Sequence, residues 1–531
     1  MVLVFAKCMS EMLSKVKEYI RWRVHQTTKR DGTVSCMILT TLLCLVPLVV
    51  LAFVVRFKMQ TPEYYIMYID SQDEALFTVD ERFLSLGLDS TIITNGFPHF
   101  NTSDPTLIKL IKYLSPAYLR IGGNQADQIV FVQDGLSGTN YRSESEFDEY
   151  ILSGSDWLQL HHLARQAGIK VIYDLNSLLR FVNGSWNSEN AQQMLSFSQQ
   201  HKLEVDWELG NEPNSYPKKF DTVVNASQLG RDFVGLRELL NGYSWYENSL
   251  LIGPSTTRLR TKDIEDYFLH FLESGGFESV GAITFHHYYF SGMNATSREF
   301  LDLSTFDYLE YCIDTVKSVL SLLPSADKPL WLGETSTAWH GGAPNMSDRF
   351  LGSFLWIDKL GLSAKMGIDV VVRQSIFKGD YALLNQSYYP NPDWWVSVLY
   401  KELVGTKVIT TETEGKAEIR LYAHCARPNS IWASGSSVVV FGVNLQDEVG
   451  FVQIKELRSA SQVYSYELSS NETLFSQFVQ LNGETLQLRQ NSNLPAFRPT
   501  VIERTETMTI SPYAIVFWVF TDTDLEACAP E

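Results

Sequence analysis

A repeated alternation of short apolar runs and helical segments, from Phe83 to about Val404, constrains the fold of this chain more than any other feature. Such alternation is typical of βα units that build a parallel sheet. Eight runs qualify as strands: Leu84–Asp89, Ala117–Gly122, Val171–Asn176, Val205–Gly210, Leu250–Gly253, Ala282–His286, Leu330–Glu334 and Val370–Gln374. Because helical sequence follows each of them, we predict an α/β fold with a closed (β/α)8 TIM barrel over residues 83–404.

Nearly all of the predicted strands end in polar residues. These residues are Asp89, Asn176, Asn211, Glu212, His286, His287, Glu334 and Gln374. In such barrels the active site is built at the C-terminal ends of the strands. The pattern therefore predicts that these side chains gather at one mouth of the barrel.

After residue 404 the helical segments disappear and strand-like segments follow one another, which predicts a β-sandwich over residues 405–531. The expected strands are Glu418–His424, Ser437–Asn444, Ser461–Leu468, Thr485–Gln490 and Ala514–Phe520. The segment 60–82 contains another strand-like run, Tyr64–Asp70, which we expect to join the sandwich.

The N-terminal region carries an uncharged run over residues 36–55 that is long enough to cross a hydrocarbon layer of ~30 Å. Seven Lys and Arg residues precede the run and only Arg56 and Lys58 follow it closely. This asymmetry predicts a cytoplasmic tail over residues 1–35 and a single-pass type II signal anchor. The rest of the chain would then be extracellular or luminal, at the cell surface, in the Golgi or in the lysosome. The alternative is a long signal sequence that is cleaved.

Sequons and cysteines agree with an oxidising, glycosylating compartment. N-glycosylation is predicted at Asn101, Asn183, Asn225, Asn294, Asn345, Asn385 and Asn471. Beyond the predicted membrane run lie Cys312, Cys425 and Cys528, and we expect a disulfide between the last two to hold the C-terminus. No Cys/His spacing typical of a zinc site occurs, so neither a metal nor a cofactor is expected.

The net charge limits the possible partners. The first 58 residues carry +6 and the whole chain −18, so the remainder carries −24. So acidic a domain argues against nucleic acids and against highly sulfated polymers as partners.

Two segments carry the chemistry: Trp207-Glu208-Leu209-Gly210-Asn211-Glu212-Pro213 and Trp331-Leu332-Gly333-Glu334-Thr335. They end the fourth and seventh predicted strands, which face one another across the mouth of a barrel. Glycoside hydrolysis needs one carboxylic acid to protonate the leaving oxygen and one carboxylate to trap the oxocarbenium-like centre. We therefore predict a retaining glycoside hydrolase with Glu212 as acid/base and Glu334 as nucleophile. Asn211 would donate a hydrogen bond to the sugar 2-OH.

Neighbouring polar residues receive weaker interpretations. Glu208 and Glu273 are given no role, because strand-end glutamates are commonly caps or solvated. His286 and His287 resemble metal ligands, but adjacent strand residues point to opposite faces and do not easily hold one ion. Tyr288 is expected to place its hydroxyl near Glu334. Arg120-Ile121-Gly122-Gly123 lacks the full pattern of a phosphate loop and is interpreted as a turn beside the sugar site.

At these residues the chain resembles the heparanase family of endo-β-glucuronidases, which includes the leech-type hyaluronidases. The resemblance extends from about Phe83 to the C-terminus. Its most specific stretches are Tyr118–Gly123, Trp207–Ser215, Gly333–Asp348, Asp358–Ala364 and Leu403–Val408.

The resemblance implies a (β/α)8 barrel with a β-sandwich, retaining chemistry and glucuronide specificity. It assigns the acid/base to Glu212, the nucleophile to Glu334 and the C-terminal disulfide to Cys425 and Cys528. The residues expected to bind substrate are Asp89, Asn124, Asn211, Lys218, Tyr288, Gly341, Gly342, Gln374, Gly379 and Tyr381. A glycosaminoglycan, either heparan sulfate or hyaluronan, is the expected substrate.

Several positions depart from the family pattern. A short acidic stretch with Glu144, Glu146, Asp148 and Glu149 stands where vertebrate heparanase has an excised linker and basic residues. Met293 replaces an arginine, His340 replaces a glycine, and Asn124-Gln125 replace a Thr-Lys pair. Sulfate recognition is thus expected to be reduced. Two alternatives stay open: an exo-acting β-glucuronidase, and a membrane-anchored glycosaminoglycan-binding protein without catalysis.

Overall fold

The computed structural model of the chain describes Glu18 and residues 64–529, except for 71–73, 95, 135–149, 326, 430, 433–435, 458–459, 461 and 504–506. The predicted membrane run 36–55 and, apart from Glu18, the predicted tail 1–35 lie outside the described residues. Among the residues that are described, no helix is both long and apolar enough to cross a membrane. The signal anchor thus stays a prediction.

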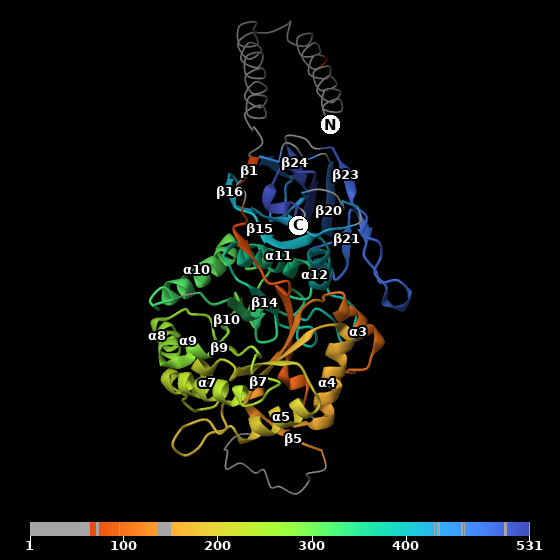
Figure 1. Cartoon of the computed structure of the whole chain (residues 1–531). Helices are drawn as coiled ribbons and strands as arrows, with labels where there is room; N and C mark the ends of the chain where they lie inside the picture. The colour runs from red at the N-terminus through yellow and green to blue at the C-terminus, as the bar shows by residue number, and fades with distance from the viewer. Residues whose placement is uncertain are drawn as a thin grey trace, which may run out of the picture. The chain divides into compact units, whose positions relative to one another are not determined.

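An eight-stranded parallel sheet lies inside the helical part of the structure (Figure 1). Its strands lie side by side in the order β8-β7-β4-β3-β14-β12-β10-β9. The bounds are β3 Leu84–Asp89, β4 Tyr118–Gly122, β7 Lys170–Leu175, β8 Val205–Leu209, β9 Ile252–Thr256, β10 Ala282–His287, β12 Leu330–Thr335 and β14 Val370–Arg373. The two ends of this order also meet, because Trp207 bridges Leu251 and its N–H donates to the Leu250 carbonyl. The sheet closes, and the predicted TIM barrel is confirmed.

Helices cover the outside of the barrel, and both sides of each strand are therefore buried, as their near-continuous apolar sequence requires. The main helices are α3 Pro105–Lys112, α4 Gly154–Ala167, α5 Glu189–Gln200, α7 Ala226–Asn241, α8 Lys262–Phe271, α10 Leu303–Leu320, α11 Phe350–Lys365 and α12 Pro392–Leu403. Their ends follow local chemistry: the Asp104 carboxylate caps the first turn of α3, and Gly168 ends α4 in the left-handed conformation.

Two further sheets pack face to face and share a hydrophobic core. The smaller has the order β16-β1-β19-β24, with bounds Thr411–Glu414, Tyr64–Ile69, Gly450–Lys455 and Met508–Ile510. The larger centres on β17 Ile419–Ala426, β18 Val438–Asn444, β25 Ile515–Thr521 and β20 Gln462–Ser470. The segment from Tyr64 thus pairs with strands from the far end of the chain. Cys425 and Cys528 form a disulfide across 103 positions, as expected.

The prediction of a strand over Thr485–Gln490 was wrong. Only β22, Glu484–Thr485, is a strand there, and a short helical turn, Gln490–Ser492, follows. The segment leaves the sheet because it docks on the barrel: Lys109 of α3 donates to the carbonyl of Asn491 at 2.8 Å. Leu486 of this segment is buried in the hydrophobic core that also contains the barrel residues.

A buried ion pair links the barrel to the sandwich. Arg420 of β17 donates to Asp358 of α11 at 2.6 Å, and the Tyr422 hydroxyl donates to the same carboxylate oxygen at 2.7 Å. Gly361 lies against the Tyr422 ring so closely that a Cβ there would come within 2.0 Å of it. The two parts of the molecule therefore meet through specific contacts.

Candidate active site

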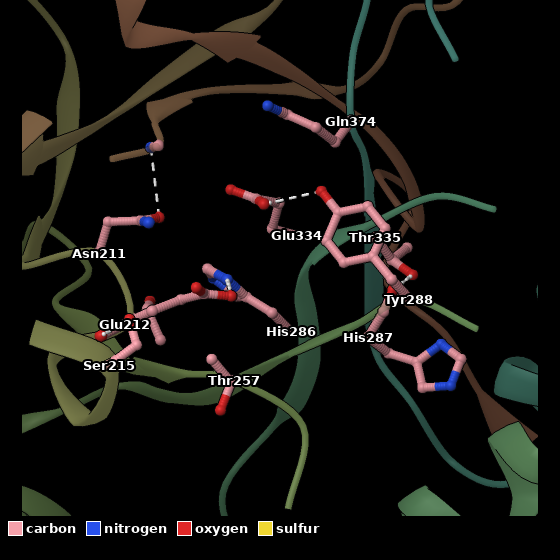
Figure 2. Close-up of polar contacts among 12 residues, drawn as sticks. Asn211, Glu212, Ser215, Thr257, His286, His287, Tyr288, Glu334, Thr335 and Gln374 are labelled. Atoms are coloured by element: carbon pink, nitrogen blue, oxygen red, sulfur yellow. Dashed lines mark hydrogen bonds and ion pairs between the residues drawn. The ribbon is translucent and has the colours of Figure 1, made fainter. Parts of the chain in front are cut away.

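The two glutamates of the predicted catalytic pair lie at the C-terminal ends of their strands (Figure 2). Glu334 belongs to β12, and Glu212 follows β8. The Glu212 backbone N–H donates to the Ser255 carbonyl at 2.9 Å, which joins this loop to the neighbouring strand β9. One carboxylate oxygen of Glu212 and one of Glu334 lie within 4.8 Å of each other. Retaining glycosidases hold their carboxyl groups about 5 Å apart, so this geometry suits that mechanism.

Glu334 is held by two donors that leave it little freedom. The Tyr288 hydroxyl donates to its Oε1 at 2.7 Å, and the guanidinium of Arg120 donates to its Oε2 at 2.9 Å. Burial, with the Glu334 charge next in size, raises the pKa of Tyr288 well above its usual value. Tyr288 therefore remains a donor, which agrees with its expected place beside the nucleophile.

Arg120, inside β4, connects Glu334 to the rest of the site. It also donates to Glu208 at 2.8 Å and to Asn211 Oδ1 at 3.1 Å, and it lies 3.9 Å from Asp174. Its side chain is 1% exposed. Burial alone would lower the pKa of the guanidinium, but the Glu208 and Glu334 carboxylates raise it above the usual value. The charge on Arg120 is thus permanent.

The sequence analysis missed this role for both Arg120 and Glu208. A signal was available: Arg120 is the single charge of β4, and Glu208 is one of two acidic residues of β8, and both strands are buried throughout. A buried charge needs a partner, and two opposite charges in nearby strands are each other's natural candidates.

Glu212 has a more open environment. The ammonium group of Lys219, the last residue of α6 (Tyr216–Lys219), lies 2.7 Å from Glu212 Oε2, and His286 Nδ1 lies 3.2 Å from Oε1. Burial raises the pKa of Glu212, but the charge of Lys219 and the hydrogen bond with His286 outweigh it and lower the pKa to about 2. Lys218, the lysine expected at the site, is exposed, and its role stays a prediction.

Asn211 is fixed on three sides. Its backbone N–H donates to the buried carboxylate of Asp127 at 3.0 Å, and its Oδ1 accepts from Gly123 N–H at 3.2 Å as well as from Arg120. Its amide nitrogen faces Asn124 Oδ1 at 3.4 Å. Its Oδ1 thus accepts from two donors while its amide nitrogen donates to Asn124, which holds the Asn211 side chain in one orientation.

Further expected substrate-binding residues line the same mouth. Gln374 donates to Asp89 at 3.2 Å, and the Tyr381 ring stacks on that of Tyr288 with centroids 6.3 Å apart. Burial raises the pKa of Asp89, and the hydrogen bonds from Thr91 oppose the shift. These contacts bring Asp89, Gln374 and Tyr381 to the Glu334 side of the site.

The glycine turn packs against the loop that carries Tyr381. Gly341 accepts from the Tyr381 N–H at 3.2 Å. Gly342 has φ 97°, and a Cβ on it would lie 2.6 Å from that same nitrogen. Gly379 also lies close, since its Cβ would come within 3.0 Å of the Gly341 carbonyl. The three glycines thus allow two loops to meet beside the catalytic pair.

His286 and His287 point to opposite faces, as the strand pattern predicts (Figure 2). His286 reaches Glu212, whereas His287 lies 3.4 Å from the buried ammonium of Lys359. By distance alone, Glu212, His286 and Glu334 could hold a metal ion. The donor set argues against one, because cationic side chains already pair with both carboxylates and would repel a further cation.

The basic residues retained near the mouth are largely engaged. Arg258 donates to the carbonyls of Tyr288 and Tyr289 and lies over the Trp339 ring. Lys262 pairs with Asp266 on its own helix. Met293 is 69% exposed, and the acidic stretch with Glu144, Glu146, Asp148 and Glu149 lies outside the described residues.

The sequon side chains are mostly accessible. Exposed positions are Asn101, Asn183, Asn225, Asn294, Asn345 and Asn471. Asn385 is half-buried and accepts backbone hydrogen bonds from Ser387 and Tyr389. Glycosylation stays a prediction, and Asn385 is the least accessible site for it.

Comparison with known proteins agrees with this geometry. The profile of "Glycosyl hydrolase family 79, N-terminal domain" matches residues 92–361. The chain belongs to glycosyl hydrolase family 79. It is thus a glycoside hydrolase by family, and the heparanase resemblance is confirmed.

Relatives within this family cover most of the chain. The "Heparanase" of Gallus gallus is 32% identical over 501 residues, which is 86% of this chain and 95% of that protein. "Hyaluronoglucuronidase" of Hirudo nipponia is 31% identical over 484 residues, or 85% and 96%. "Inactive heparanase-2" of Homo sapiens is 31% identical over 521 residues, or 85% and 87%.

A solved structure shows the same fold at low identity. The rhamnosyl-β-D-glucuronidase of Fusarium oxysporum aligns with a TM-score of 0.63 at 14% identity, covering 85% of this chain and 99% of that one. This likeness supports the barrel architecture alone.

Proposed function

We propose that this family 79 protein is a retaining endo-β-glucuronidase that cleaves glycosaminoglycans, with Glu212 as acid/base and Glu334 as nucleophile. The observation that carries the proposal is the approach of the two carboxylates to within 4.8 Å at the mouth of the barrel. Family membership supports hydrolysis, and the pair supplies the groups that hydrolysis with retention needs.

The roles follow from the contacts. Glu334 attacks the anomeric carbon while Glu212 gives its proton to the departing glycosidic oxygen. Glu212 then takes a proton from water, which attacks the same carbon and frees Glu334. Tyr288 and Arg120 hold Glu334 in position. Asn211, whose amide nitrogen also donates to Asn124, is the proposed donor to the sugar 2-OH.

The substrate follows from family likeness and charge. Relatives named for heparan and hyaluronan cleavage support a glucuronide-containing polymer. Met293 is exposed where the family pattern has an arginine, and Arg258 donates to backbone carbonyls, so neither position offers a free cation to a sulfate group. We propose a polymer of low sulfation. The residues proposed to line its cleft are Asp89, Asn124, Asn211, Lys218, Tyr288, Gly341, Gly342, Gln374, Gly379 and Tyr381.

A second candidate is a membrane-anchored binding protein without catalysis, and the likeness to a relative named inactive favours it. Sequence identity is nearly the same toward relatives named active and inactive, so it does not discriminate. Both carboxylates and their partners are present in this chain, and for that reason hydrolysis is the preferred proposal.

Digestion of heparan sulfate and hyaluronan side by side tests the proposal. The purified full chain is incubated with each polymer at about pH 5, a pH at which a carboxylic acid serves as a proton donor. Product size is measured by gel filtration, with Glu334→Gln as the inactive variant and Glu273→Gln, an exposed glutamate, as the matched control. Shortening of one polymer by the parent and the control alone is expected. Binding of both polymers without shortening would support the second candidate.

Localisation is proposed on the sequence alone: a type II membrane protein with its catalytic part extracellular or luminal. Protease treatment of sealed cells, followed by detection of each terminus, tests it. Degradation of the C-terminal part with survival of the N-terminal tail is expected at the cell surface. Protection of both ends until permeabilisation would indicate Golgi or lysosome.

A further inference from the structure

The contact between Lys219 and Glu212 differs in kind from the other ion pairs of the site. Its two side chains are 23% and 16% exposed, whereas the Arg120 side chain that pairs with Glu334 is 1% exposed. Lys219 also donates to the neutral Asn124 oxygen. In the described part of the chain, Glu212 is the one carboxylate within ion-pair distance of Lys219. The ammonium therefore lies at the solvent-facing side of the catalytic pair.

This arrangement conflicts with the duty of a general acid. Glu212 must carry a proton when the glycosidic bond breaks, yet its neighbours favour the carboxylate. The charged and titratable groups that face it come from several elements: Lys219 of α6, His286 of β10, Tyr288 and Glu334. Glu334 raises the cost of ionising Glu212, but Arg120 already compensates its charge. Of these groups, only Lys219 combines a full positive charge with a long, flexible and partly exposed stem.

We propose that an anionic group of the bound sugar chain draws the Lys219 ammonium away from Glu212, and that this exchange lets Glu212 take up the proton it then donates. The inference rests on the function proposed above and deepens it. The group is a carboxylate or a sulfate, both of which accept hydrogen bonds from an ammonium.

The proton balance of the exchange is simple. One proton passes from solvent to Glu212 when the sugar chain binds. It moves to the glycosidic oxygen as the bond from that oxygen to the anomeric carbon breaks and the bond from Glu334 to the same carbon forms. A neutral sugar chain would leave Lys219 on Glu212 and would meet an unprotonated acid. Lys219 thus becomes a positioning residue that makes catalysis depend on substrate charge.

Proton uptake on binding tests the exchange without requiring turnover. Glu334→Gln, which binds but does not cleave, is titrated calorimetrically at about pH 5 in buffers of different ionisation enthalpy. The probes are a hyaluronan octasaccharide, the same octasaccharide with its carboxyl groups reduced to alcohols, and a sulfated heparan octasaccharide. Uptake approaching one proton is expected with an anionic chain and close to none with the reduced chain. Uptake with hyaluronan assigns the carboxylate, and uptake with the sulfated chain alone assigns the sulfate.

Matched variants separate the exchange from a structural role. Adding Lys219→Met should lower the uptake, because the variant has no ammonium on Glu212 for the bound chain to displace. Lys219→Arg should retain it, and Lys112→Met, an exposed lysine on α3, should leave it unchanged.

Binding of the anionic chains without proton uptake, equal uptake after Lys219→Met, or no binding of either anionic chain would overturn the exchange. Polymer cleavage without proton uptake on binding would contradict the proposed exchange alone. Proton uptake without polymer cleavage would contradict the proposed hydrolysis alone.

Discussion

The two glutamates of the proposed catalytic pair each lie beside a cation, but the two cations are held differently. Beside Glu334, the proposed nucleophile, a buried guanidinium is fixed by Glu208, Asn211 and Glu334. Beside Glu212, the proposed acid/base, a partly exposed ammonium at the end of a short helix meets one carboxylate. A nucleophile has to remain ionised throughout binding, whereas an acid/base has to change its protonation state during each cycle. The proposed roles thus match the cations: buried Arg120 lies beside Glu334, which would stay ionised, and partly exposed Lys219 lies beside Glu212, which would gain and lose a proton.

Removing the nucleophile should have the largest effect. We expect Glu334→Ala to lower kcat on an aryl β-glucuronide by roughly 10⁴-fold or more. Added azide should restore product formation as the α-glucuronyl azide, because azide then attacks from the face that Glu334 occupied. Product configuration by NMR checks the assignment. A β-azide from this variant would show that the two glutamates have been assigned in reverse.

Removing the buried cation should be nearly as damaging and should also weaken the fold. Arg120→Met leaves Glu208 and Glu334 buried without a cation, which typically costs about 3–5 kcal/mol of unfolding free energy. We expect kcat to fall by about 10²–10³-fold, as when a preorganised donor is removed. Arg120→Lys should not restore either quantity, because a single ammonium does not reproduce the planar fork. Denaturant unfolding and steady-state kinetics measure both effects, and near-normal values for Arg120→Lys would contradict the proposed role of the guanidinium.

Changing the acid/base should produce an effect that depends on the leaving group. Glu212→Gln should lower polymer cleavage by about 10²–10⁴-fold. With an aryl glucuronide whose phenolate leaves without a proton, the first chemical step should hardly change, as single-turnover measurement of phenol release would show. Equal losses on both substrates would argue that Glu212 acts in some other capacity, such as holding the sugar.

The smallest expected effect is a pH dependence of stability. Because burial of Glu212 is outweighed by Lys219 and His286, its pKa falls from 4.5 to about 2 on folding. The stability that this carboxylate adds is therefore fully present above about pH 4.5 and is lost as the pH falls toward 2. Unfolding midpoints of the parent protein and Glu212→Gln should thus differ at pH 6 and converge as the pH is lowered. A gap that widened at low pH would indicate the opposite sign of the shift.

Much of the barrel and the proximity of Glu212 and Glu334 could be predicted because the relevant signals are local. Apolar runs such as Val370–Gln374, with a polar residue at the end, indicate both the strand and its orientation. The link between Arg120 and Glu208 could not be derived in the same way, since it joins β4 to β8 across the intervening strand β7 and depends on closure of the barrel. The sequence does not show which of the adjacent lysines Lys218 and Lys219 reaches the site. That depends on the direction that each side chain takes from the short helix α6 (Tyr216–Lys219). The strand predicted over Thr485–Gln490 was wrong because strand-like sequence alone does not show whether a segment pairs in a sheet or leads into a turn that docks on a helix.

The insertion of β1 between β16 and β19 has a consequence for how the molecule is made. Tyr64 leaves the ribosome before any barrel strand, yet its partner Phe451 is synthesised after the last of them. The nascent chain must therefore carry an apolar strand without its partners while the whole barrel emerges, a period in which such a strand invites aggregation. The smaller sheet closes only near the end of translation. Expression from Phe83 onward would remove β1 and leave β16 and β19 without the strand between them, so the chain from Tyr64 onward is the smallest unit we expect to mature correctly.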